Sequence, residues 1–146
     1  MKKTIWLDMD GTIADLYNVP NWLSYLEAED AYPYKKAGVM HNMSLLARLM
    51  NRAQKSGYEL GIISWLSKTS TPYYDTQVTS AKLQWLAYHL PSVHFNKIYI
   101  VAYGTPKSTF MQTSNDILID DEERNRKEWT GVSYHPTQLI SVLKTL

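Results

Sequence analysis

Two carboxylates stand one residue apart directly after a short apolar run near the start of the chain. The run is Ile5-Trp6-Leu7, and the stretch that follows reads Asp8-Met9-Asp10-Gly11-Thr12. At a separation of about 4 Å, two like charges repel by about 4 kcal/mol even at an effective dielectric constant of about 20. A divalent cation bound by the carboxylates offsets this repulsion. The pattern therefore predicts a strand that ends in a metal-binding turn.

A second pair of acids follows another apolar run far down the chain. Ile117-Leu118-Ile119 leads directly into Asp120-Asp121. In parallel sheets the carboxyl ends of the strands lie along one edge, and ligands bind beyond that edge. We therefore expect the two acidic pairs to form a single site that binds a cation.

Strand-like and helix-like patterns alternate along the chain. Short apolar runs predict strands at residues 4–7, 58–63, 98–101, 117–119 and 132–134. Helical spacing of apolar residues predicts a helix over 46–53, a second over 83–90 and a last one that begins at Pro136. This alternation is typical of an α/β fold, here a Rossmann-like three-layer sandwich with a mainly parallel sheet. With 146 residues, the chain is expected to form one domain.

Two local features complete the fold prediction. In the second helix, Leu83, Leu86, Ala87 and Leu90 share one face and are expected to be buried, with Pro91 ending the helix. A segment at about residues 15–40 lies outside the alternation and is rich in aromatic residues. We expect it to be a small helical cap insert over the strand ends. The alternative is a surface helix that packs its aromatic side chains on the sheet.

Composition excludes several classes of function. The net charge is +1 and the basic residues are scattered, so neither a membrane nor a nucleic acid is an expected partner. The chain has no cysteine, which excludes disulfides, thiol chemistry and cysteine-based zinc sites. The apolar run before Asp8 is too short for a signal peptide or a membrane span. A soluble, cytoplasmic protein is therefore expected.

The order of these motifs resembles the four signatures of the haloacid dehalogenase-type phosphohydrolases. The signatures are the Asp8–Thr12 stretch, Ser64 at the end of an apolar strand, Lys107, and Asp120-Asp121. A looser likeness to the 5'(3')-deoxyribonucleotidase branch runs from Ile62 to Asp121. It rests on the strand end with Ser64, Pro72-Tyr73-Tyr74, the helix with Trp85, the Pro106-Lys107-Ser108 loop and the Leu-Ile-Asp-Asp strand end.

The resemblance implies a reaction and assigns its participants. Asp8 matches the nucleophile that attacks phosphorus, and Asp10 matches the general acid and base. The implied cofactor is Mg²⁺, held by Asp8, the backbone carbonyl of Asp10 and Asp120, with Asp121 in support. Lys107 is expected to neutralise the nucleophile and the phosphate together.

A second group of residues is expected to bind the phosphate. The Ser64 hydroxyl would donate to a phosphoryl oxygen, and Gly11 would let the loop turn so that backbone N–H groups face the same oxygens. Met9 and Thr12 belong to this loop, and Trp65 is expected to border the site. The implied substrate is a small phosphomonoester. A nucleotide would be recognised by stacking of its base on Tyr17, Trp22 or Trp65.

Simpler interpretations of the same residues stay open. Asp-Gly is a common turn pair, and Asp120-Asp121 suits the start of a helix. Ser64 and Lys107, taken singly, are ordinary strand-end and surface residues, and Trp65 can pack on the sheet edge. At the level of function, the alternatives are a phosphorylatable receiver domain, a non-catalytic phosphate- or nucleotide-binding module of the same fold, a phosphomutase, and a phosphatase that acts on nucleic-acid ends. A receiver would carry its adjacent acids early, whereas here they come late.

Overall fold

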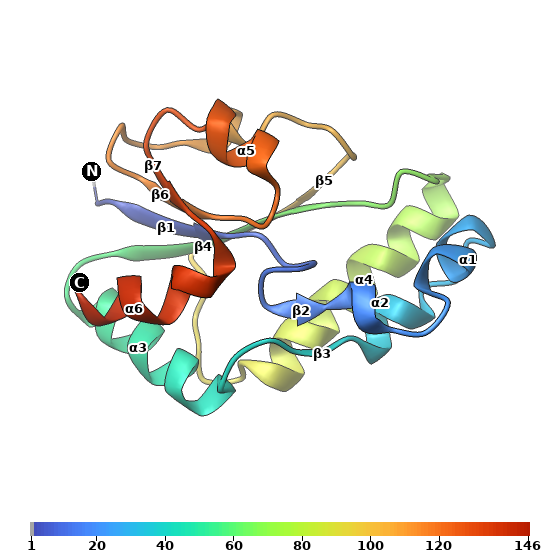
Figure 1. Ribbon diagram of the computed structural model, residues 1–146, viewed down its shortest axis with the longest axis horizontal. Helices are drawn as coiled ribbons and strands as arrows, with labels where there is room; N and C mark the ends of the chain where they lie inside the picture. Colours follow the sequence, from blue (N-terminus) through green and yellow to red (C-terminus); the bar gives the residue numbers. More distant parts are fainter. Residues whose placement is uncertain (1) are drawn as a thin grey trace.

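The computed structural model describes residues 2–146, and at their centre lies a five-stranded sheet with helices against it (Figure 1). The strand order is β5-β4-β1-β6-β7, and every neighbouring pair is parallel. The strands are β1 (Thr4–Leu7), β4 (Glu59–Trp65), β5 (Lys97–Val101), β6 (Ile117–Ile119) and β7 (Val132–Tyr134). The predicted α/β fold with a mainly parallel sheet is confirmed.

Helices connect the strands and cover the sheet. They are α3 (Met43–Lys55), α4 (Pro72–His89), α5 (Glu123–Glu128) and α6 (Leu139–Lys144). In Figure 1, α3 and α6 lie on one side of the sheet and α5 on the other. Pro136 begins a short 3-10 turn, η3 (Pro136–Gln138), so the α-helical part of the last helix starts three residues later than expected. Across residues 2–146, none of the helices combines the length and apolar character needed to cross a membrane.

The central strand β1 is buried along its whole length, because helices pack against both of its faces. One face meets the main core between the sheet and α3, α4 and α6. The other face carries Trp6, which packs with Ile63, Leu118 and Trp129. Trp6 is paired in register with Gly61 on β4, where an added Cβ would overlap the indole ring. The absence of a side chain at Gly61 therefore leaves space for the Trp6 ring.

Helix α4 buries only part of the predicted face: Leu86 and Leu90 are buried as expected, and the other two residues are not. Thr71 caps its N-terminus by accepting a hydrogen bond from the Tyr74 N–H, and Pro72 occupies the first turn. The helix has 18 residues, more than twice as many as the apolar spacing around Leu83 predicted, and Leu83 and Ala87 are exposed. The buried residues are Tyr74, Val78, Ala81, Lys82, Trp85 and Leu86. Contacts along the full helix, rather than its last two turns, determine the buried face.

Residues 14–39, called the insert below, leave the sheet layers and return at nearly the same place. The insert contains β2 (Ala14–Asp15), the 3-10 turn η1 (Leu16–Asn18), α1 (Trp22–Glu27), α2 (Tyr32–Lys36) and β3 (Gly38–Val39). Strands β2 and β3 pair antiparallel, which brings the two ends of the insert together. Its helices lie beside α4, away from the sheet (Figure 1), and form a separate small core with that helix.

Candidate active site

The structure brings the two predicted acidic pairs together beyond the carboxyl ends of neighbouring strands. Asp8 follows β1 and Asp120 follows β6, and the Asp8 N–H donates to the Ile119 carbonyl at 3.0 Å. Asp8, Asp120 and Asp121 each offer one carboxylate oxygen, and these oxygens all lie within 4.8 Å of one another. Three carboxylates around one point form a donor set suited to a hard divalent cation such as Mg²⁺.

Lys107 links the two acidic pairs. It lies in the 3-10 turn η2 (Lys107–Phe110), and its Nζ is 2.8 Å from Oδ1 of Asp8 and 2.7 Å from Oδ2 of Asp120. Burial alone would lower the pKa of Lys107, but the two carboxylates more than offset this and raise it. Lys107 is therefore held as a cation inside the site, and two of its three N–H groups have partners.

The loop after β1 is folded around one backbone carbonyl. The Met9 carbonyl accepts hydrogen bonds from the N–H groups of Thr12, Ile13 and Ala14, and the Met9 side chain is buried in the core. The Thr12 hydroxyl donates to Oδ2 of Asp8 at 3.1 Å. The Gly11 N–H donates to the Ala14 carbonyl at 2.8 Å, so this N–H has a partner within the loop.

Gly11 is surrounded closely by other groups of the site. Its φ of +78° lies in the left-handed region, and a Cβ at this position would overlap the Asp121 carboxylate and the Tyr17 ring. The glycine therefore has two roles: it allows the sharp turn and leaves space for Asp121. Its predicted role as a turn residue is consistent with this geometry.

The carboxylates of Asp120 and Asp121 are crowded. Burial first, and then the nearby Asp8 charge, raise the pKa of Asp120 to about 6 and that of Asp121 to about 8. Asp120 is fully buried and accepts hydrogen bonds from the Glu122 N–H and the Asn125 side chain. The positive charge of a divalent cation among these carboxylates would relieve their repulsion, so the residues present fit the predicted metal.

Asp10 and Ser64 meet at a buried lysine that sequence reasoning missed. Lys82 on α4 places its Nζ 2.7 Å from Oδ2 of Asp10, 2.5 Å from Oγ of Ser64 and 2.8 Å from the Trp65 carbonyl. The Asp10 side chain thus contacts Lys82, whereas those of Asp8 and Asp120 contact Lys107. No motif or spacing in the sequence indicated a role for Lys82, because its contacts depend on how α4 packs. Asn125 was missed for a similar reason, because it lies on a short helix without a recognisable motif.

A cleft of about 610 Å³ opens above these groups. Its charged groups include Asp8, Asp10, Lys107, Asp120 and Asp121, and residues of the insert line another part of it. The residues that the insert contributes are Leu16, Tyr17, Trp22, Leu23, Leu26, Glu27 and Tyr34. The cleft therefore joins a charged end to a largely apolar and aromatic wall.

The aromatic residues of the cleft differ in their contacts. The Trp65 indole N–H donates to the Thr105 carbonyl at 2.9 Å, and Lys107 and Arg124 lie 5.4 and 5.7 Å from its ring centre. Tyr17 and Trp22 pack edge to face with ring centres 4.9 Å apart, and Tyr17 is 46% exposed. Trp65 is thus engaged by protein groups, and the exposed Tyr17 is the better placed of these rings to meet a ligand.

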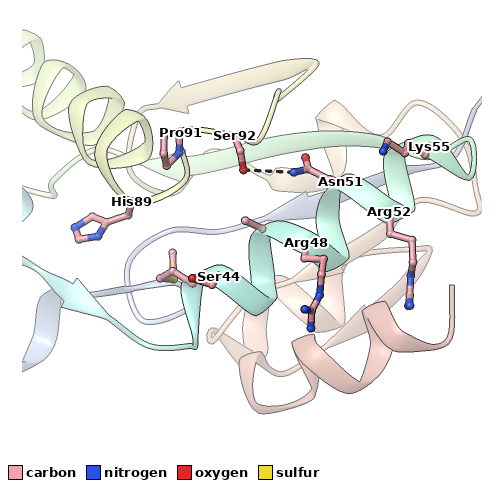
Figure 2. Close-up of a pocket in the computed structure, with 10 residues that line it drawn as sticks. Ser44, Arg48, Asn51, Arg52, Lys55, His89, Pro91 and Ser92 are labelled. Carbon is pink, nitrogen blue, oxygen red and sulfur yellow. Dashed lines mark hydrogen bonds between the residues drawn. The ribbon is translucent and has the colours of Figure 1, made fainter.

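A second hollow, of about 710 Å³, lies along α3 on another part of the molecule (Figure 2). Arg48, Arg52 and Lys55 provide its charged groups, and Asn51 bridges to Ser92 across it at 3.4 Å. Its lining residues among 2–146 include no carboxylate. This hollow therefore lacks the metal-binding groups that the sequence predicted, and the cleft at the strand ends has them.

Comparison of the sequence with protein-family models and with curated proteins gives no match. The fold, however, matches solved structures. D,D-heptose 1,7-bisphosphate phosphatase from Burkholderia thailandensis aligns with a TM-score of 0.55 and 14% identity, over 89% of this chain and 75% of that one. This chain has the fold of that phosphatase. The corresponding enzyme from B. bronchiseptica, complexed with magnesium and phosphate, aligns with a TM-score of 0.51 and 11% identity, over 89% of this chain and 77% of that one. Neither structure is a nucleotidase, so the likeness to that branch stays a prediction.

Proposed function

We propose that this protein is a magnesium-dependent phosphomonoester hydrolase that works through an aspartyl-phosphate on Asp8. The observation that carries the proposal is the buried Lys107, whose ammonium contacts both Asp8 and Asp120 while Asp121 lies beside them. The residues proposed as nucleophile, as cationic partner and as metal ligands thus lie close together. Both structural neighbours are phosphatases, which supports the same class of reaction.

In the proposed first step, a carboxylate oxygen of Asp8 forms a bond to phosphorus as the bond from phosphorus to the leaving oxygen breaks. Asp10 gives its proton to the leaving oxygen. In the second step a water attacks phosphorus, Asp10 takes the proton of that water, and the bond to Asp8 breaks to release phosphate. Burial and the nearby Asp8 charge raise the pKa of Asp10, although Lys82 acts against them. This shift favours a protonated Asp10 at the start of the cycle.

The remaining groups stabilise charge on the phosphoryl group. Lys107 has one N–H beyond its two carboxylate partners, and this N–H is available to a phosphoryl oxygen. Asp8, Asp120, Asp121 and the Asp10 carbonyl would hold Mg²⁺, which screens the negative nucleophile from the negative phosphate. Thr12 fixes the Asp8 carboxylate through its hydroxyl, so the nucleophile is oriented before substrate binds.

We propose further that residues 15–40 act as the cap of a single domain and that the substrate is a nucleotide. The observation in favour is the exposed Tyr17, which packs against Gly11 and against Trp22 and so connects the catalytic loop to the aromatic wall. A flat base stacked on the Tyr17 ring would place its phosphate at the acidic groups of the cleft. Such a stacking contact contributes about 1–3 kcal/mol.

The test is hydrolysis of a generic aryl phosphate by the purified protein with and without Mg²⁺. We expect turnover only with Mg²⁺, and a loss of at least about a thousandfold in Asp8→Asn, because a carboxamide cannot act as the nucleophile. Thermal unfolding of the variant checks that it is folded. Undiminished turnover by folded Asp8→Asn would contradict the assignment of the nucleophile. Mg²⁺-dependent phosphate binding without any turnover would instead identify a non-catalytic binding module.

A further inference from the structure

Lys82 is a buried lysine whose hydrogen-bonding capacity is used up inside the protein. Only 1% of it is exposed, although it lies in the middle of α4. An ammonium group has three N–H donors and no acceptor. The three acceptors around it are Oδ2 of Asp10, Oγ of Ser64 and the Trp65 carbonyl, each within 2.8 Å. No donor is left for a ligand, so Lys82 differs from Lys107, which keeps one.

These contacts fix the direction of the Ser64 hydroxyl. Because Lys82 can only donate, the Ser64 oxygen must accept from it. The single hydrogen of the hydroxyl therefore remains free to be donated to another group. Ser64 is fully buried and directly precedes Trp65, which lines the cleft. In the proposed function the acceptor of its hydrogen is a phosphoryl oxygen. A hydroxyl without this partner could point its hydrogen toward any nearby acceptor.

The same contacts divide the two oxygens of Asp10 between different tasks. Oδ2 accepts from Lys82 at 2.7 Å, and Lys82 also lies 5.1 Å from the centre of the Tyr34 ring, which belongs to the insert. The Asp10 carboxyl is thus held from the side of α4, and Tyr34 of the insert lies against the lysine that holds it. Its other oxygen, Oδ1, is left to carry the proton that is exchanged with the substrate.

We infer that Lys82 is a positioning residue for the reaction: it orients the proton-carrying oxygen of Asp10 and the donor hydrogen of Ser64 at the same time. This inference rests on the proposed phosphohydrolase function. It predicts that loss of Lys82 impairs protonation of the leaving group more than any other step. A lysine that serves only to fill the core would have no such selectivity.

The experiment compares two substrates that differ in their need for a general acid. The leaving group of dinitrophenyl phosphate departs without a proton, whereas that of phenylethyl phosphate requires one. The measured quantity is kcat/KM, because it reports the steps up to departure of the leaving group and omits the later hydrolysis of the aspartyl-phosphate. The variants are Lys82→Met, which removes the ammonium group but keeps most of the length of the side chain, and Lys97→Met as the matched control. Lys97 pairs with Glu59 on the sheet, away from the cleft.

We expect Lys82→Met to lower kcat/KM by about a hundredfold or more on phenylethyl phosphate, which lies within the usual contribution of a general acid. On dinitrophenyl phosphate the loss should be about tenfold or less, since only the contact with Ser64 is affected there. Lys97→Met should leave both values within about twofold, as expected for a partly exposed ion pair. Ser64→Ala should lower both values by the same factor.

Lys82→Arg provides the test if Lys82→Met does not fold. It keeps the buried charge, but its planar fork cannot reproduce the three contacts, so the same selective loss is expected. Equal losses on both substrates in a folded Lys82 variant, or wild-type values in Lys82→Arg, would overturn the positioning role while leaving the phosphohydrolase proposal intact. Absence of hydrolysis of either substrate by the wild-type protein with Mg²⁺ would overturn both.

Discussion

Gly11 is the residue at which the candidate site has the least room. Its left-handed backbone and its contact with Asp121 both exclude a side chain. We expect Gly11→Ala to lower the free energy of unfolding by about 2–4 kcal/mol, because backbone strain and overpacking add together. The displaced Asp121 should also weaken Mg²⁺ binding. Urea unfolding and Mg²⁺ titration measure the two effects.

Gly57 offers a control for the backbone part of this effect. Its φ is +108°, but nothing lies within 4 Å of an added Cβ. Gly57→Ala should therefore lose only about 1–2 kcal/mol from strain and bind Mg²⁺ normally. Equal effects of the two substitutions on Mg²⁺ binding would show that the Asp121 contact is unimportant.

At the scale of elements, the buried Asp116 joins the start of β1 to the loop that precedes β6. One of its oxygens accepts from the Thr4 N–H and the Thr113 hydroxyl, and the other from the Trp6 indole and the Gln112 N–H. Burial alone would raise the pKa of Asp116, but these hydrogen bonds outweigh it and lower the pKa. Asp116 is therefore a structural carboxylate, distinct from the acids of the site.

The lowered pKa of Asp116 predicts a pH-dependent contribution to stability. The contribution is complete above the unfolded-state pKa of about 4 and is lost as the pH falls through the lower native pKa. Asp116→Asn should lower the free energy of unfolding by about 3 kcal/mol at neutral pH and by clearly less in strong acid. Urea unfolding at the two pH values measures this difference. Glu123→Gln, at an exposed ion pair, should change stability by less than about 0.5 kcal/mol at either pH.

A further prediction concerns Trp22 of the insert, whose ring packs edge to face against the Tyr17 ring. If a base stacks on Tyr17 and Trp22 holds that ring in place, Trp22→Ala should raise KM for a nucleoside monophosphate by about fivefold to a hundredfold, the equivalent of about 1–3 kcal/mol. KM for a sugar phosphate should stay the same. Steady-state kinetics with the two substrates measure both effects. Equal rates on both, unaltered in Trp22→Ala, would count against recognition of a base.

At the scale of the whole molecule, metal binding should stabilise the fold, because the three acids meet only in the folded chain. At Mg²⁺ about 100-fold above the dissociation constant, the gain is about 2.7 kcal/mol, or a rise in Tm on the order of 5–10 °C. Differential scanning calorimetry with Mg²⁺ and with a chelator measures it. Asp120→Asn should lose the response, whereas Asp116→Asn should keep it. An identical Tm with and without Mg²⁺ in the wild-type protein would contradict the metal site.

The architecture and its strand ends could be predicted from the sequence because they depend on local patterns. Apolar runs of strand length placed β1 and β6 at their observed bounds, and parallel connection then put Asp8 next to Asp120. Helix faces were less predictable. Leu83 was expected to be buried and is 42% exposed, because the packing of the whole of α4 against the insert set the rotation of the helix.

The sequence by itself determined which carboxylates lie at strand ends and that the strands are parallel. The first follows from apolar runs within short segments, and the second from the alternation of strand and helix patterns along the chain. Only the tertiary structure decided what surrounds those carboxylates. Lys82 and Asp10 are 72 positions apart, and their contact depends on how α4 docks beside the strand ends. The packing of Tyr17 against Gly11 likewise depends on how the insert folds back. Contacts of this kind leave no local pattern, because each depends on the relative placement of elements that are formed separately.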